Sequence, residues 1–371
     1  MKKSTRERNE TPSMQKLEGS ERSRITTVGI DVGDRASQYA AVDGQGELIC
    51  EGRIATSESA LHGLLGKLTP GVHVVIEVGT HSPWMSRSFQ LKGFAVTVAN
   101  TRSLRLITGS QRKSDRRDAR VLATIGQSAP QLLDPVEHQS ELVQQHRAVL
   151  LARDVMVRSR ARLIIQARGI VKAIGGRLQR CSAESFAARA SAQIPDVLRP
   201  ALDPLVVEVE RLSEQIGAYD TMVEKLAATY PACKAVMAIK GVGPVTGLAF
   251  VLAVGDPHRF ASSRCIGPYF GLTPRQHASG DSTPQLRITK AGNPFMRRLL
   301  VGAAHYILGP FGPDCDLRRH GLTLAARGGK NAKKRAVVAI ARKLAVLMHK
   351  LWISGVAYDP FFNATRAMAA A

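Results

Sequence analysis

The sequence has few acidic residues and no long apolar run. Asp and Glu number 30 against 52 Lys and Arg in 371 residues, which leaves a formal net charge of +22. A chain this basic usually binds a polyanion, and nucleic acid is the default partner. A membrane surface is the competing partner, but no run of about 18 apolar residues is present to cross a bilayer. The composition therefore favours a nucleic-acid-binding protein that is not a membrane protein.

Cysteine is also scarce. The five cysteines are scattered and show no CxxC spacing, which argues against a disulfide framework or a zinc site. We expect reduced thiols in a cytoplasmic protein. Residues 1–24 are polar and charged and lack the apolar segment of a secretory signal. They are predicted to form a disordered tail.

Residues 25–130 have the pattern of an α/β domain. Short apolar or alternating runs predict strands, and Gly44-Gln45-Gly46 predicts a tight turn between two of them. The expected strands cover residues 28–32, 38–42, 48–54, 72–78 and 94–99, and the expected helices cover 57–68 and 83–91. Strands that alternate with helices after an opening meander are typical of an α/β layer fold.

Residues 131–235 are predicted to be a helical spacer, with a long helix at 141–173. A second helix carries apolar residues four and three positions apart, which is a heptad pattern. These residues are Leu205, Val209, Leu212, Ile216, Tyr219, Val223 and Leu226. Either the stripe forms a coiled coil that pairs protomers, or it packs within its own chain. Residues 236–371 are predicted to be a mainly α domain, with a basic amphipathic helix at 331–351.

Two acids fall in apolar strands. Asp31 lies in Val28–Gly33, and Glu77 lies in Val74–Val78. Burial of a charged carboxylate in such a strand destabilises the fold by several kcal/mol unless another group compensates the charge. A divalent metal ion would compensate both acids.

A second pair of acids, Asp115 and Asp118, is spaced to share one helix face. Ser114 is expected to cap that helix, and acids in its first turn also suit the helix dipole, which is the alternative reason for their presence. Four carboxylates in the order strand, strand, helix, helix favour a site for Mg²⁺ or Mn²⁺ that performs phosphoryl transfer. The nearby cations are predicted phosphate contacts, namely Arg102, Arg105, Arg112, Lys113, Arg116, Arg117 and Arg120.

One alternative reading concerns the first strand. Gly29-Ile30-Asp31-Val32-Gly33 is similar to the first phosphate loop of the actin and sugar-kinase ATPases. The sequence offers no second phosphate loop or adenosine motif, so nuclease-type chemistry is favoured.

Two motifs stand out in the C-terminal part. Ala238–Thr246 is similar to a helix-hairpin-helix, in which Lys240, Gly241 and Gly243 would contact a phosphate, although a plain turn between packed helices is the alternative. Further on, Ser279-Gly280 lies in a polar loop between basic elements. Taken alone, such a serine is usually a turn residue.

These motifs occur together in one known family. The chain resembles the bacterial insertion-sequence transposases of the family numbered one hundred and ten, which is related to the Piv DNA invertases. The resemblance covers about residues 28–360. Its motifs are Gly29-Ile30-Asp31, Ile76-Glu77, Ser114-Asp115-Arg116-Arg117-Asp118-Ala119, Gly241-Val242-Gly243, Gly271-Leu272-Thr273-Pro274-Arg275, Ser279-Gly280 and Thr289-Lys290-Ala291-Gly292-Asn293.

The resemblance implies a RuvC-like, RNase H-like fold whose acids Asp31, Glu77, Asp115 and Asp118 bind Mg²⁺. It further implies a coiled-coil spacer and a C-terminal domain in which Ser279 is the nucleophile. Ser282, three residues later, is the alternative nucleophile. The expected phosphate contacts around the serine are Arg275, Lys290, Arg297 and Arg298.

The resemblance also implies the reaction and its partners. Family members recombine double-stranded target and donor DNA through a covalent serine–DNA intermediate. They work as homo-oligomers, expected here as a dimer or tetramer, and several are guided by a structured bridge RNA. Three alternatives stay open: a RuvC-like nuclease that uses water, a Piv-type invertase without a guide RNA, and a non-enzymatic scaffold.

Overall fold

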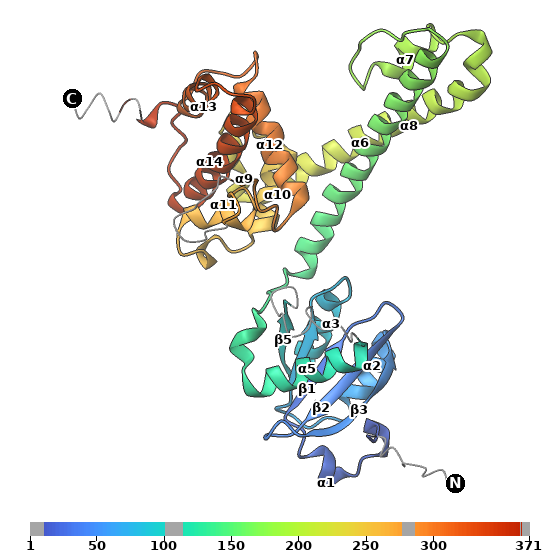
Figure 1. Ribbon diagram of the computed structural model, residues 1–371, viewed down its shortest axis with the longest axis vertical. Helices are drawn as coiled ribbons and strands as arrows, with labels where there is room; N and C mark the ends of the chain where they lie inside the picture. Colours follow the sequence, from blue (N-terminus) through green and yellow to red (C-terminus); the bar gives the residue numbers. More distant parts are fainter. Residues whose placement is uncertain (1–10, 101–113, 277–285, 364, 366–371) are drawn as a thin grey trace, which may run out of the picture. The chain divides into compact units, whose positions relative to one another are not determined.

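The computed structural model describes residues 11–100, 114–276, 286–363 and 365, and it divides into two units, residues 1–139 and 140–371 (Figure 1). Each unit has its own hydrophobic core. Both are described separately below.

The first unit is built on a five-stranded sheet in the order β3-β2-β1-β4-β5. Strand β2 is antiparallel to β1 and β3, whereas β1, β4 and β5 are mutually parallel. The bounds are β1 Thr27–Asp31, β2 Ala36–Val42, β3 Leu48–Ala55, β4 His73–Glu77 and β5 Ala95–Ala99. All five predicted strands are therefore present, each within one or two residues of its expected bounds.

Helices cover both faces of this sheet (Figure 1). On one face α2 (Glu58–Leu65) and α3 (Ser82–Leu91) bury Leu61 and Phe89 against Val28 and Ile30 of β1. On the other face α5 (Asp115–Ser128) covers β1, β2 and β4, and the short η2 (Pro130–Leu133) follows it. This mixed α/β layout is consistent with the RuvC-like domain that the sequence predicts.

Helix α5 lies unusually close to the sheet because small residues face it. A Cβ atom on Gly29 would overlap the backbone of Ala119 and Ala123, so only glycine fits there. At the carboxyl end of the helix, the Gln127 amide oxygen accepts hydrogen bonds of 2.8 and 2.7 Å from the hydroxyls of Thr26 and Thr27. The helix is thus fixed at its middle and its end.

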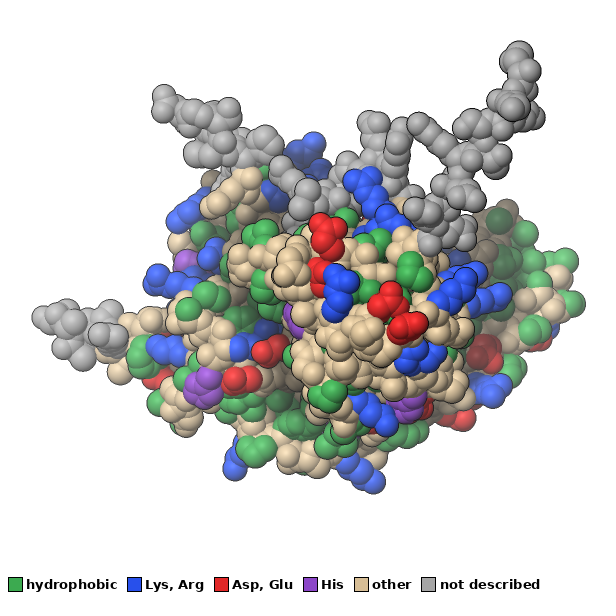
Figure 2. All heavy atoms as spheres, turned by 90° about the horizontal axis from the view of Figure 1, so that it is seen from below, with side chains coloured by type: hydrophobic (Ala, Val, Ile, Leu, Met, Phe, Trp, Pro, Cys, Tyr) green, Lys and Arg blue, Asp and Glu red, His purple; other side chains and the backbone are tan. Residues whose placement is uncertain are grey.

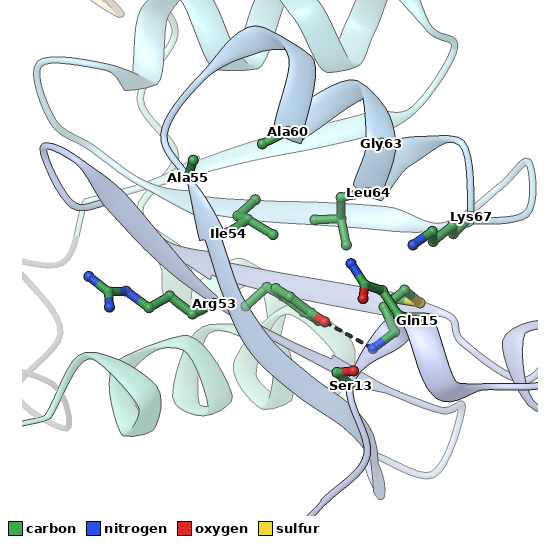
Figure 3. A pocket seen from close by; sticks show the side chains of 11 residues that line it. Ser13, Gln15, Arg53, Ile54, Ala55, Ala60, Gly63, Leu64 and Lys67 are labelled. Carbon is green, nitrogen blue, oxygen red and sulfur yellow. Dashed lines mark hydrogen bonds between the residues drawn. The ribbon is translucent and has the colours of Figure 1, made fainter.

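Residues 11–24 correct the predicted tail. They form η1 (Met14–Lys16) and α1 (Gly19–Arg22), and Met14 is only 1% exposed. The Met14 amide donates to the Tyr39 hydroxyl at 2.9 Å, and Ser13 and Gln15 line a hollow of about 540 Å³ beside β3 and α2 (Figure 3). The prediction was wrong for this segment because two apolar side chains, Met14 and Leu17, anchor an otherwise polar stretch.

The second unit begins with a helical hairpin. Helix α6 (Glu141–Ala173) packs against α8 (Arg199–Thr229), with α7 (Phe186–Ser191) and η3 (Asp196–Leu198) between them in sequence. Leu150, early in α6, shares a core with Val223, late in α8, whereas Val171 shares a core with Leu202. The two helices are therefore antiparallel.

The packing of α6 on α8 explains the heptad stripe of apolar residues in α8. Val209, Leu212, Ile216 and Val223 are buried within the chain, while Leu205, Tyr219 and Leu226 are half-buried. Packing between α6 and α8 accounts for the stripe without a second protomer. The coiled-coil pairing of protomers therefore stays a prediction.

The rest of the second unit is a helical domain. Its bounds are α9 Pro231–Met237, α10 Pro244–Val254, η4 Pro257–Arg259, η5 Ser263–Cys265, α11 Ile266–Tyr269, α12 Pro294–Leu308, α13 Asp316–Ala326 and α14 Ala332–Ser354. Apolar faces of α10, α12 and α14 form its core around Phe250, Leu300 and Leu344. Among the described residues, no helix is both long and apolar enough to span a membrane.

Candidate active site and nucleic-acid contacts

Strands β1 and β4 place the first two acids. They are parallel neighbours with Ile30 paired to Ile76, so Asp31 and Glu77 end the two strands at the same edge of the sheet. Both residues are half-buried. Neighbouring parallel strands bring their carboxyl ends together, which is where α/β sheets usually carry their sites.

Helix α5 supplies the other two acids in its first turn. The Ser114 hydroxyl accepts from the Arg117 amide at 3.4 Å, so Ser114 is the N-cap that the sequence predicts. Asp115 is exposed, whereas Asp118 is only 5% exposed. Spacing of three residues puts both acids on one side of the helix.

The pKa of Asp31 is affected by the other three acids. Burial and a hydrogen bond to Glu77 raise the pKa of Asp31, and the negative charges around it raise it further, to about 8. These charges belong to Glu77, Asp115 and Asp118. A carboxyl with so high a pKa keeps its proton at neutral pH, and the proton offsets part of the negative charge.

The donor set fits a hard divalent cation. Four carboxylates offer only oxygen ligands, which Mg²⁺ and Mn²⁺ prefer. Within the described ranges, no three His, Cys, Asp or Glu side chains adopt the arrangement of a formed metal site. The direct hydrogen bond between Asp31 and Glu77 would therefore give way when both share a cation.

Glu51 is a fifth acid near this helix, and the sequence analysis missed it. Its side chain is only 2% exposed and lies on β3. Arg120 donates to both of its oxygens at 2.6 Å, and Arg116 also donates to Oε1. Burial alone would raise the pKa of Glu51, but these two guanidinium groups outweigh it and lower the pKa to about 2. Its partners lie more than sixty positions away in sequence, so no local pattern signals the contact.

The two motifs on either side of the predicted serine, at residues 271–275 and 289–293, lie next to each other. The Arg275 amide donates to the Arg287 carbonyl at 2.9 Å, and the Thr289 amide donates to the Thr273 carbonyl at the same distance. Gly271 packs against the backbone of Ala291, where a Cβ atom would overlap. The segments before and after residues 277–285 are therefore paired, whereas Ser279 and Ser282 lie outside the described residues.

Two of the predicted phosphate contacts in this region already have protein partners. Arg297 donates through Nη1 to the carbonyls of Phe270 and Ala291, at 3.0 and 2.6 Å. Arg298 donates to Asp154 of α6 at 2.5 Å. Both arginines therefore hold backbone or helices together, and their contact with DNA stays a prediction.

The other two are on the surface of the unit. Arg275 and Lys290 are both exposed. Lys290 has a φ of 58°, a left-handed conformation that costs energy in a residue other than glycine. Such strain is most often kept where it positions a functional group.

The segment predicted as a helix-hairpin-helix consists of α9, a turn and α10, which a plain turn between packed helices would also give. Gly241 has a φ of 99°, which disfavours other residues, and a Cβ atom there would also meet the ring of Tyr306. Both reasons favour glycine at this position. Lys240 and Gly243 are exposed at this turn. Contact of the turn with phosphate stays a prediction.

Among the cations near the first site, Arg116 pairs with Glu51, and both Arg116 and Arg117 are exposed at the start of α5. Arg120, another predicted phosphate contact, is also paired with Glu51. The other predicted contacts lie outside the described residues, namely Arg102, Arg105, Arg112 and Lys113. On the face drawn in Figure 2, Lys and Arg side chains are spread over the surface, with Asp and Glu beside some of them.

Comparison with known proteins identifies both parts of the chain. Residues 28–175 match the DEDD transposase domain of the IS110 group, and residues 233–313 match the domain described as Transposase IS116/IS110/IS902 family. Together the two matches cover more than half of the chain.

Several transposases are similar to this chain over most of its length. The transposase of insertion sequence element IS1111A from Coxiella burnetii is 29% identical, with 88% of this chain and 89% of the relative aligned. The transposase of element IS1328 from Yersinia enterocolitica is 26% identical over 76% of this chain and 83% of its own length. A probable family 20 transposase from Pseudomonas aeruginosa is 22% identical over 91% and 99%. The chain belongs to the IS110/IS116/IS902 family of insertion-sequence transposases.

Proposed function

We propose that this transposase cuts and rejoins double-stranded DNA with Mg²⁺ held by Asp31, Glu77, Asp115 and Asp118. One observation carries the proposal: Asp31 and Glu77 end adjacent parallel strands and share a hydrogen bond, and burial, that hydrogen bond and the charges of the other three acids together raise the pKa of Asp31 to about 8. A divalent cation would offset the cost of burying carboxylates at one edge of the sheet, and Mn²⁺ would serve in place of Mg²⁺. When bound, the cation would polarise the scissile phosphate and favour the ionised form of the attacking hydroxyl.

The proposed nucleophile is the Ser279 hydroxyl, with Ser282 as the alternative. Its oxygen forms a bond to phosphorus while the bond from phosphorus to the 3′ oxygen breaks, so the products are a phosphoserine and a free 3′-hydroxyl. A 3′-hydroxyl of a partner strand then attacks the phosphoserine and restores the serine. No external energy source is needed, because each step exchanges one phosphodiester for another.

The chain's own residues have separate roles in this scheme. Asp31 must lose its proton before it serves as an oxygen ligand. Hydrogen bonds pair the segments before and after residues 277–285. The exposed Arg275 and Lys290 in these segments are the proposed phosphate contacts.

The proposed nucleic-acid partners are target DNA, donor DNA and a structured bridge RNA. A net charge of +22 supports several polyanionic partners. We further propose that the active form is a dimer or tetramer. The test for RNA is to purify the protein, sequence the RNA that copurifies, and compare it with DNA flanking the gene. RNA without such a match would favour an invertase-like reaction without a guide.

A second candidate is a RuvC-like nuclease that hydrolyses DNA with water. The match of residues 28–175 to a DEDD domain favours it, because that domain alone holds all four acids. Denaturing electrophoresis of protein incubated with end-labelled DNA and Mg²⁺ separates the two candidates. A protein–DNA adduct that is lost in Ser279→Ala supports the serine reaction, whereas cleavage without an adduct supports hydrolysis.

The metal site is tested by Asp31→Asn and Glu77→Gln. Each variant should abolish Mg²⁺-dependent cleavage while the protein stays folded and still binds DNA. Normal cleavage by either variant would show that the four acids are not the metal site.

A further inference from the structure

Helix α5 carries two of the four acids, and different residues hold its middle, its end and its first turn against the sheet. The middle is held by Gly29 and the carboxyl end by Gln127, which bonds Thr26 and Thr27. These contacts all lie at or beyond Ala119. The first turn, with Asp115 and Asp118, must be held by something else.

Glu51 is placed to hold that turn. It pairs with Ala40 across β2 and β3, and Ala40 packs in the same cluster as Ala119 and Ala123. Cross-strand partners point to the same face of a sheet, so Glu51 faces α5. Its two partners on the helix, Arg116 and Arg120, lie one turn apart and lie on either side of Asp118 in sequence.

The burial of Glu51 makes this contact a strong one. A carboxylate that is 2% exposed is destabilising unless it is paired, and here both oxygens accept from guanidinium groups. The fork of Arg120 binds the carboxylate in a bidentate manner, which fixes direction as well as distance. Rotation of α5 about its axis would break both pairs.

We propose that Glu51 is a positioning residue for the metal site: through Arg116 and Arg120 it fixes the rotation of α5 so that Asp115 and Asp118 face Asp31 and Glu77. This inference rests on the proposed function, since it assumes that the four acids bind the cation. It also gives Arg116, whose side chain is 54% exposed, a structural role as a partner of Glu51.

The test is direct binding of Mn²⁺ to the full-length protein, measured by electron paramagnetic resonance in the absence of DNA. Glu51→Gln keeps the shape of the side chain but removes its charge. Partners outside the ligand shell usually contribute about 10–100-fold to metal affinity, and we expect a loss in this range. Arg120→Met, which leaves the Arg116 pair in place, should give a smaller loss in the same direction.

Asp43→Asn is the matched control. Asp43 is also a buried acid of the first unit, paired with Arg24 at 2.9 Å, but it lies in the turn between β2 and β3. Its replacement should lower the melting temperature and leave Mn²⁺ affinity unchanged. If Glu51→Gln lowers the melting temperature but binds Mn²⁺ as tightly as Asp43→Asn does, Glu51 is only structural and the inference is wrong.

A third variant separates this failure from failure of the proposed function. Asp31→Asn removes a proposed ligand and should abolish Mn²⁺ binding. Unchanged binding in Asp31→Asn would overturn the metal site itself. Loss in Asp31→Asn with no change in Glu51→Gln would overturn only the role of Glu51.

Discussion

Gly29 of β1 lies directly against Ala119 of α5, and a Cβ atom on Gly29 would overlap the Ala119 carbonyl oxygen. Because Gly29 has no side chain, α5 packs closely on β1 at this position, which is two residues before Asp31 in the strand. The same glycine therefore belongs both to the core of the fold and to the geometry of the candidate metal site.

Gly29→Ala should destabilise the first unit. The added methyl group meets backbone atoms that cannot rotate away, and overpacking of this kind costs about 1–3 kcal/mol. Thermal unfolding is the measurement, with Gly63→Ala in α2 as the control, because no atom lies within 4 Å of a Cβ at Gly63. Equal melting temperatures for the two variants would contradict the close approach of α5.

The stability of the protein should depend on Glu51 in acid. The pKa of Glu51 is lowered from 4.5 to about 2 in the folded protein. Because the folded value lies below the unfolded one, the ionised form stabilises the fold above pH 4.5, and this stabilisation is lost as the pH falls toward 2. The difference in urea midpoint between the wild type and Glu51→Gln should shrink over this range. A difference that stays constant with pH would show that the charge of Glu51 is not involved.

Arg297→Met should impair recombination without changing the number of DNA phosphates bound. Arg297 donates to the carbonyls of Phe270 and Ala291, so its loss should loosen the paired segments that flank residues 277–285. Each phosphate contact contributes a slope of about −0.9 to a plot of log affinity against log salt. We expect Arg297→Met to keep the wild-type slope and Arg275→Ala to reduce it by about one contact. A reduced slope in Arg297→Met would instead make this residue a phosphate contact.

Val209→Ala should lower stability independently of protein concentration. Val209 is buried in the core between α6 and α8 of one chain, and removal of two methyl groups costs about 2 kcal/mol. Val207, on the same helix and 63% exposed, provides the control Val207→Ala. A melting temperature that rises with protein concentration in the wild type, and loses that dependence in Val209→Ala, would place the stripe between protomers.

Local patterns in the sequence predicted the elements that hold the acids. Apolar runs located β1 and β4, and the cost of an acid in such runs pointed to Asp31 and Glu77. Ser114 was predicted as the cap of α5 from its residue type and the acids after it, and the structure confirms that cap. These features depend on neighbours within a few positions, so sequence alone was sufficient.

Features that depend on distant partners were not predictable in this way. A cation beside a motif looks the same whether it binds DNA or the protein, so nothing local indicated that Arg116 pairs with Glu51. Arg297 and Arg298 raise the same difficulty, because their partners appear only when the chain is folded. The anchoring of Met14 was missed because the polar composition around it outweighed two apolar side chains.

The order of the sheet has a consequence for how the four acids respond to substitution. Asp31 and Glu77 end adjacent strands in the middle of a hydrogen-bonded sheet, so their backbone spacing cannot change without breaking the ladder. Asp115 and Asp118 belong to the first turn of a helix held by side chains. The acidic cluster thus has one half set by backbone hydrogen bonds and one half set by side-chain contacts, so substitutions of side chains are expected to displace Asp115 and Asp118 before Asp31 and Glu77.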